Sequence, residues 1–304
     1  MTNAPAASVA VSPRWARAYR RYGQTVPNHP GKGCIMRALH GVGLRSRRPF
    51  ACQMSNGTWL AIWPEEGLLG NETVGWTCFR ERSWDPHVEA CIRRTLAPGD
   101  TAIDVGANLG YMTAAMAQCV GPAGQVWAFE PVDETYELLE VCRALNGFDQ
   151  ITTARLALGA AEGSAEITYD RRHSGLATMH PERVGGEVQR VTVRTLDALV
   201  AAGEAPPRPA LVKIDVEGHE LDVLQGAQAT IGEGRPAIVF EVNERAATAA
   251  GWTLADAATL LTSLAEYRFW LIDADGARPL DPFAFRLEGD PLSDPHADVL
   301  ARVV

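Results

Sequence analysis

Glycines and acidic residues stand at the ends of short apolar stretches in this 304-residue chain, where they could meet a ligand. Gly106 and Gly110 follow Asp104 and let the backbone turn and approach a ligand closely. Twenty residues past Gly110, Glu130 places a carboxylate that can accept two hydrogen bonds from a ribose diol. In a competing interpretation, Glu130 is only a favourable charge at the start of the next helix, worth about 0.3–1 kcal/mol. The turn and the carboxylate together favour ribose binding.

A second set of charged residues follows two later apolar stretches, and it comprises Lys213, Asp215, Glu217, His219, Glu220 and Glu241. Unpaired burial of a charge costs several kcal/mol, so we expect Lys213 and Asp215 to pair or to face a cleft. The four carboxylates offer oxygen ligands for a hard cation such as Mg²⁺. We favour the alternative without a metal, in which Glu217 and Glu220 bind backbone amides at a helix start and Lys213 pairs across the sheet.

Strands and helices alternate from residue 101 onward, which predicts a doubly wound α/β fold with a mostly parallel sheet. The strands are expected at 101–105, 125–130, 151–158, 210–216, 237–242 and 269–272. The helices are expected at 111–120, 133–145, 196–202, 221–231 and 254–265. Residues 164–169 and 188–193 alternate with period two and are predicted as added antiparallel strands around a polar loop. In such a sheet, ligands bind outside the carboxyl ends of the strands.

The first 50 residues differ in charge from the rest of the chain. They hold nine Lys or Arg and no acid, which leaves 19 basic against 37 acidic residues for the remainder. We expect a basic arm at 1–50 with one short helix at 13–22, a cap at 51–100 with a hairpin and a helix, and the main domain at 101–304. The arm could contact an anionic lipid, glycolipid or phosphate, or act as a transit peptide. We favour an extension that docks on the acidic body or stays mobile.

The composition, 46% hydrophobic and 21% charged, is that of a globular chain and excludes collagen, coiled coil and disorder. No window approaches the ~20 apolar residues of a membrane span, and arginines interrupt the start that a secretory signal would need. Six cysteines without a CxxC pair predict neither a zinc site nor a disulfide framework. We therefore expect a cytoplasmic protein.

The motifs at 104–111, 129–131, 213–220 and 240–242, in this order and spacing, resemble those of the FkbM-type methyltransferases. That family belongs to the class I, Rossmann-like enzymes that use S-adenosylmethionine and have a seven-stranded sheet, and the resemblance covers about residues 55–280. It implies a cofactor site that includes Asp104, Gly106, Asn108, Gly110, Glu130, Leu158 and Asp215. In this site Glu130 would bind the ribose, the backbone near Leu158 would meet the adenine, and Asp215 would lie beside the transferred methyl group.

The resemblance implies O-methylation of a hydroxyl on a saccharide, glycolipid or polyketide-like natural product. An alcohol is a poor nucleophile while protonated, so a general base is expected to contribute ~10²–10⁴-fold. The candidate catalytic residues are His219, Asp215 and His173, the last on the polar loop 170–187, which could close as a lid.

Three other functions compete with this one. A noncatalytic binding module could retain the fold, and an oxidoreductase could use a nucleotide cofactor. Asn108 and Tyr111 replace the second and third glycines of the dinucleotide motif, which disfavours the oxidoreductase. A nucleic-acid methyltransferase is disfavoured by the acidic body, and the sequence does not fix the oligomeric state.

Overall fold

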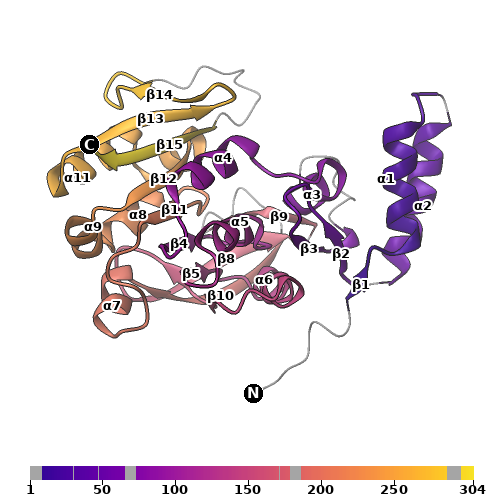
Figure 1. Cartoon of the computed structure of the whole chain (residues 1–304), viewed down its shortest axis with the longest axis horizontal. Helices are drawn as coiled ribbons and strands as arrows, with labels where there is room; N and C mark the ends of the chain where they lie inside the picture. Colours follow the sequence, from indigo (N-terminus) through magenta and orange to yellow (C-terminus); the bar gives the residue numbers. More distant parts are fainter. Residues whose placement is uncertain are drawn as a thin grey trace.

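The computed structural model describes residues 9–29, 31–46, 48–65, 73–170, 172–178, 186–285 and 296–304, without the side chains of 46 and 173–178. Its centre is an eight-stranded sheet with the order β14-β13-β15-β12-β11-β4-β5-β6 (Figure 1). The strands are β4 (Thr101–Val105), β5 (Gln125–Phe129), β6 (Ile151–Ala154), β11 (Leu211–Ile214), β12 (Ala237–Asn243), β13 (Tyr267–Asp273), β14 (Gly276–Leu280) and β15 (His296–Val303).

The winding of this sheet starts at β4 in its middle, runs outward through β5 to β6, and then returns to β11 and β12 on the other side. These five strands are parallel, whereas β15 lies antiparallel between β12 and β13. The doubly wound fold predicted from the alternation is therefore confirmed, with β14 as an edge strand beyond the seven expected. The order reverses between β4 and β11, where such a sheet leaves a crevice for a ligand.

Helices cover both faces of the sheet. One face carries α4 (Pro86–Thr95), α5 (Tyr111–Val120) and α6 (Asp133–Asn146). The other carries α7 (Leu196–Ala201), α8 (Glu220–Gln225), α9 (Gln228–Gly234), α10 (Glu244–Ala250) and α11 (Leu254–Leu264). Strand alternation explains the division, because Ala102 of β4 packs with the first set while Ile103 and Val105 pack with the second.

Two predicted elements are broken in the structure. The strand expected at 151–158 ends as β6 at Ala154, and β7 (Ala157–Leu158) pairs instead with β10 (Glu187–Arg194) in a second sheet of order β7-β10-β8-β9. The helix expected at 221–231 is two helices, α8 and α9. A Cβ at Gly226, between them, would lie 2.0 Å from the carbonyl oxygen of Gly159, so the close approach of these two backbones accompanies the break.

The second sheet also corrects the predicted polar loop. Its remaining strands are β8 (Gly163–Asp170) and β9 (His173–Thr178), and β9 falls within the 170–187 segment that was expected to be a loop. Residues 171 and 179–185 of this segment lie outside the described residues. A strand paired with β8 replaces part of the expected flexible lid.

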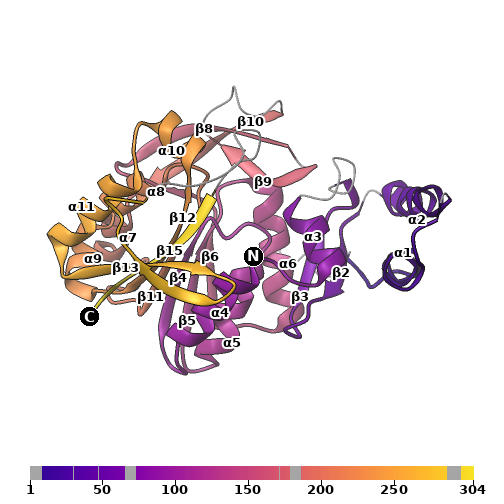
Figure 2. The same ribbon diagram turned by 90° about the horizontal axis from the view of Figure 1, so that it is seen from above.

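The arm contains two helices where the sequence predicts one. Helices α1 (Arg14–Thr25) and α2 (Lys32–Ser46) lie side by side and project from the body in both views (Figures 1 and 2). The strands β1 (Ala10–Val11), β2 (Phe50–Gln53) and β3 (Trp59–Ile62) form a small sheet, and α3 (Val74–Glu81) follows. Because β1 pairs with β2, the arm shares a sheet with the cap. The domain boundaries at 50 and 100 stay a prediction.

Candidate active site

A cavity of about 770 Å³ opens at the carboxyl ends of the central strands. Its β5-side half, as we call it, is lined by Phe129, Glu130, Leu156, Ala157, Leu158 and Ile167. Its β12-side half is lined by Asp85, Asp215, Glu217, His219, Glu241 and Asp298. The turn after β4 lies between these two halves, because β4 lies between β5 and β11 in the sheet.

Gly106 sits where the ends of β4 and β11 come together. Its φ is +76°, and a Cβ there would lie 1.8 Å from the carbonyl oxygen of Asp215. The backbone N–H groups of Gly106 and Ala107 both donate to the carbonyl oxygen of Phe129, at 3.0 Å each. The turn is therefore fixed on both sides by neighbouring strands, and any side chain at position 106 would force those strands apart.

Glu130 holds the turn from the tip of β5. It is 5% exposed, and its Oε2 accepts a hydrogen bond of 2.9 Å from the backbone N–H of Asn108. Its Oε1 accepts from the N–H of Val132 at 2.9 Å and from the hydroxyl of Thr135 at 2.7 Å. Burial raises the pKa of Glu130, and these three hydrogen bonds oppose the rise. A carboxylate has about four acceptor positions, so capacity for a ligand hydroxyl remains.

Lys213 lines the cavity and joins two carboxylates, Asp215, which also lines it, and the buried Asp104. Its Nζ lies 3.1 Å from Oδ2 of Asp215 and 3.5 Å from Oδ1 of Asp104. Asp104 is fully buried and also accepts a 2.6 Å hydrogen bond from Thr113. Burial lowers the pKa of Lys213, but Asp215 and Asp104 raise it above its ordinary value. Lys213 is therefore a cation that orients Asp215 and not a proton acceptor.

His219 stands at the start of α8 and lines the β12-side half of the cavity. Its Nδ1 lies 2.8 Å from Oδ2 of Asp222. This aspartate–histidine pair fixes the ring and favours the tautomer with a proton on Nδ1, in which Nε2 is the basic nitrogen. The arrangement is one that general bases use.

Glu220, next to His219, has a different place. Its Oε1 accepts from the backbone N–H groups of Val216 and Gly218, both at 3.1 Å. Burial raises the pKa of this 1% exposed carboxyl to about 7. It therefore supports the turn that carries His219, as the alternative without a metal expects.

Carboxylates gather in the β12-side half. One oxygen from each of Asp215, Glu217 and Glu241 lies within 4.8 Å of the others. Glu241 also faces Asp298 across the β12–β15 pair. Burial, with Asp215 and Glu217 next, raises the pKa of Glu241 well above its ordinary value. Mg²⁺ bound here stays a hypothesis.

Two parts of the β12-side half are not predicted from the sequence. Asp85 comes from the junction before α4, where its φ of +36° is left-handed. Asp298 comes from β15, and burial followed by Asp85 and Asp215 raises its pKa to about 7. The period-two pattern of residues 296–303 is the signal that could have revealed β15.

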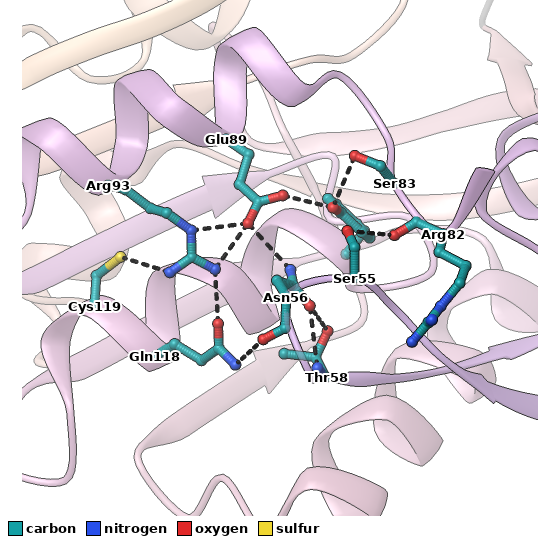
Figure 3. Close-up of polar contacts among 10 residues, drawn as sticks. Ser55, Asn56, Thr58, Arg82, Ser83, Glu89, Arg93, Gln118 and Cys119 are labelled. Atoms are coloured by element: carbon teal, nitrogen blue, oxygen red, sulfur yellow. Dashed lines mark hydrogen bonds and ion pairs between the residues drawn. The ribbon is translucent and has the colours of Figure 1, made fainter.

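Tyr111, at the start of α5, lines the cavity, and its hydroxyl donates a hydrogen bond to Glu89. Figure 3 shows Glu89 among Arg93, Asn56 and their polar neighbours. Glu89 accepts hydrogen bonds from the hydroxyl of Tyr111 at 2.5 Å, from Nε of Arg93 at 2.8 Å and from Asn56 at 3.2 Å. Although burial alone would raise the pKa of Glu89, these hydrogen bonds hold it below its ordinary value. The network ties the β2–β3 turn and α4 to α5 and so fixes the cap against the cavity.

Not every predicted site residue reaches the cavity. Gly106, Asn108, Glu130, Leu158, Asp215 and His219 line it. Asp104 lies beneath it. Gly110 faces α6, where its Cβ would meet Leu139 at 2.8 Å. The backbone of His173 pairs with that of Asp170, and its side chain lies outside what the structure describes.

A doubly wound sheet whose glycine turn and strand-end carboxylate face one cavity defines a nucleoside-binding α/β protein. The family model of the methyltransferase FkbM domain matches residues 104–274, more than half of the chain. The chain therefore belongs to the FkbM methyltransferase family, which confirms the resemblance of the motifs.

Curated proteins similar to this chain are also named as methyltransferases. Hexuronic acid methyltransferase AglP of Haloferax volcanii is 34% identical over 132 residues, which cover 42% of this chain and 49% of that protein. Methyltransferase 1 of Beauveria bassiana is 26% identical over 160 residues, which cover 46% and 63%. The alignments thus span about half to two-thirds of these relatives. Among solved structures, methyltransferase FkbM from Methylobacillus flagellatus is 16% identical with a TM-score of 0.45, over 74% of this chain and 52% of that one.

Proposed function

We propose that the protein is an S-adenosylmethionine-dependent O-methyltransferase that acts on a hydroxyl of a saccharide, glycolipid or polyketide-like natural product. The observation that carries the proposal is the single cavity, in which Glu130 and the Gly106 turn meet Asp215 and His219. Membership of the FkbM family supports it. No helix among the described residues is long and apolar enough to cross a bilayer.

The cavity fits the cofactor in size and chemistry. Small-molecule sites span about 300–1,000 Å³, and this one lies within that range. The apolar side chains of Leu156, Leu158 and Ile167 suit a flat base, and Glu130 suits a ribose diol. The Gly106 turn, which also lines the cavity, suits an amino-acid tail. S-adenosylmethionine supplies a methyl group on a sulfonium sulfur, which an oxygen nucleophile displaces in line.

The chain's own part in the reaction is to hold the acceptor and take its proton. Nε2 of His219, with Nδ1 directed to Asp222, accepts the proton of the acceptor hydroxyl. Asp215, oriented by Lys213, accepts a hydrogen bond from the acceptor and keeps it near the methyl donor. Alignment of the two reactants can supply ~7–11 kcal/mol of the barrier, so positioning is the larger contribution.

The acidic β12-side half favours a neutral, hydroxyl-rich acceptor. Carboxylates accept hydrogen bonds from hydroxyl groups, whereas they repel another carboxylate. The cations Lys213 and Arg245 also line the cavity, but acids outnumber them there, with Asp85, Glu241 and Asp298 among those that would face such an acceptor. We therefore propose that this chain differs in acceptor from the relative named for a hexuronic acid.

Calorimetric titration with S-adenosylmethionine and with NADH tests the cofactor, followed by mass spectrometry of neutral glycosides for the gain of one methyl group. Heat with S-adenosylmethionine alone and a methylated neutral sugar support the proposal. Heat with NADH alone would favour the oxidoreductase as the function. Binding of S-adenosylmethionine without turnover on any acceptor would favour a noncatalytic module.

A metal is not required by the proposed mechanism. Because burial and the neighbouring carboxylates raise the pKa of Glu241, a proton can take the place of a cation in offsetting its charge, and treatment with EDTA is expected to leave turnover unchanged. Initial rates with and without added Mg²⁺ check this. A loss of activity in EDTA that Mg²⁺ restores would assign the Asp215–Glu217–Glu241 cluster to a cation.

A further inference from the structure

The outer faces of the α1–α2 hairpin combine cations with exposed aliphatic side chains. On α1, Arg14, Arg17 and Arg21 are exposed and recur at helical spacing. On α2, Ile35 is 41% exposed and Val42 is 50% exposed. These two aliphatic residues lie on the same face of the helix, two turns apart. The exposed Ala38 lies between them, so the three form a stripe.

Arg45 lies near this stripe on α2 and Arg37 lies on another exposed side of the same helix, and neither has an internal counter-charge in the described part of the chain. Arg37 and Arg45 of α2 are exposed. No ion pair joins them, or the three exposed arginines of α1, to an acid among the described residues. The segment 1–50 contains no Asp or Glu at all. The hairpin thus exposes cations and an aliphatic stripe, on a molecule whose other part is acidic.

The hairpin is a packed unit, so these side chains are displayed by a defined surface. A Cβ at Gly43 would lie 2.5 Å from the ring of Trp15, which shows how closely α2 approaches α1. The ring of Tyr19 packs on Trp76 of α3 at 5.2 Å, and Nε2 of His40 lies 2.7 Å from the carbonyl oxygen of Pro64. The aromatic side chains of the packing face point to α3, and the arginines and aliphatics remain outside.

We propose that the α1–α2 hairpin docks the protein on an anionic lipid bilayer. Interfacial helices bind membranes by burying an apolar stripe at the headgroup boundary while Lys and Arg meet anionic lipids. The stripe of Ile35, Ala38 and Val42 supplies the first contribution and the five exposed arginines supply the second. Nucleic acid would use the cations but not the exposed aliphatics, and it draws affinity from stacking on aromatic side chains. Trp15 and Tyr19 are committed to internal packing, which favours lipid.

The packing face of the hairpin contacts α3, which begins at Val74, and Val74 lines the cavity. The inference itself concerns lipid binding and holds whether or not the protein transfers methyl groups.

Cosedimentation of the full chain with vesicles tests the proposal. One set contains phosphatidylcholine alone and the other about one-third phosphatidylglycerol. We expect binding to the anionic vesicles that weakens when salt is raised from about 0.1 to 1 M, because the screening length falls from ~10 to ~3 Å. The double variant Ile35→Asp, Val42→Asp should bind about tenfold or more weakly. Val188→Asp, which changes a 61% exposed valine of β10, is the matched control and should bind like the wild type.

A second variant guards against misfolding of the first. Arg14→Gln, Arg17→Gln and Arg21→Gln together remove charge from an exposed face, and circular dichroism checks that helix content is retained. About tenfold weaker binding of this variant to anionic vesicles supports docking. Three results would overturn it: no binding of the wild type to anionic vesicles, equal binding by both hairpin variants, or a hairpin that prefers duplex DNA to the vesicles in direct competition. Light scattering that shows the aspartate variant losing only a dimer, with vesicle binding intact, would assign the stripe to self-association instead.

Discussion

The two halves of the cavity are built in different ways. The β5-side half comes from segments that follow neighbouring strands, and its one carboxylate, Glu130, has three hydrogen bonds from the protein. The β12-side half draws on four separate segments, from Asp85 to Asp298, and its carboxyl groups crowd one another. Backbone turns thus prepare the first half for one fixed ligand. The second half keeps charged side chains whose protonation can adjust to an acceptor.

The largest expected effect comes from distorting the Gly106 turn between the two halves. Gly106→Ala would place a Cβ 1.8 Å from the carbonyl oxygen of Asp215 at a φ of +76°, so the turn must move. We expect no measurable binding of S-adenosylmethionine by calorimetry. Gly121→Ala is the matched control, because Gly121 also has a positive φ but open space around it. Normal affinity in the Gly106 variant would show that the turn does not meet the cofactor.

The next largest effect distinguishes the role of the β12-side half from that of the β5-side half. His219→Ala should lower turnover by ~10²–10⁴-fold while the dissociation constant of S-adenosylmethionine stays the same, since the proton acceptor is lost and the nucleoside contacts are not. Steady-state rates and calorimetry measure the two quantities. Replacement of the exposed His87 by alanine serves as the control. Full activity in the His219 variant would transfer the role to His173 or to a metal.

Glu130→Gln should do the reverse and weaken cofactor binding by ~1–3 kcal/mol, or about 5- to 150-fold, because a charge-assisted acceptor for the ribose is lost. Glu137→Gln, on the exposed face of α6, is the control. A thermal melt without ligand distinguishes this loss from loosening of the Asn108 turn. An unchanged dissociation constant would contradict the ribose assignment.

The smallest effect concerns the pH dependence of stability. The pKa of Asp298 is raised to about 7 from an ordinary value near 4, so the folded state holds more protons than the unfolded state between these values. The contribution of Asp298 to the free energy of unfolding therefore falls as pH rises from about 4 to 7. Asp298→Asn should flatten this slope and raise the melting temperature at pH 8 by about 2 °C for each kcal/mol regained. Asp149→Asn, at an exposed site, should leave the slope unchanged. An unaltered slope in the Asp298 variant would show that the pKa of that carboxyl is not raised in the folded protein.

The sequence predicts the β5-side half better than the β12-side half because of distance along the chain. Gly106 and Glu130 follow adjacent parallel strands, so local pattern is enough to bring them together. Asp298 reaches the cavity only because β15 inserts between β12 and β13, and Asp85 only through a left-handed backbone. The position of neither residue can be predicted from the propensities of its neighbours in the sequence.

The same reasoning explains the hairpin. Three glycines within α2 each cost about 1 kcal/mol in helix propensity, which hides the helix from a sequence pattern. In the structure Gly43 gives room to the ring of Trp15, so packing between the helices outweighs the local preference. The doubly wound class of the main sheet could be predicted from the alternation of strands and helices. The pairing of β7 in a second sheet could not, because it depends on its distant partner β10.

A crystal structure of the protein with S-adenosylhomocysteine tests the central claim most directly. The account predicts ribose hydroxyls on the carboxylate of Glu130, the adenine against Leu158 and Ile167, and the amino-acid end at the Gly106 turn. A nucleoside bound elsewhere, or bound in the cavity without contact to Glu130, would contradict it.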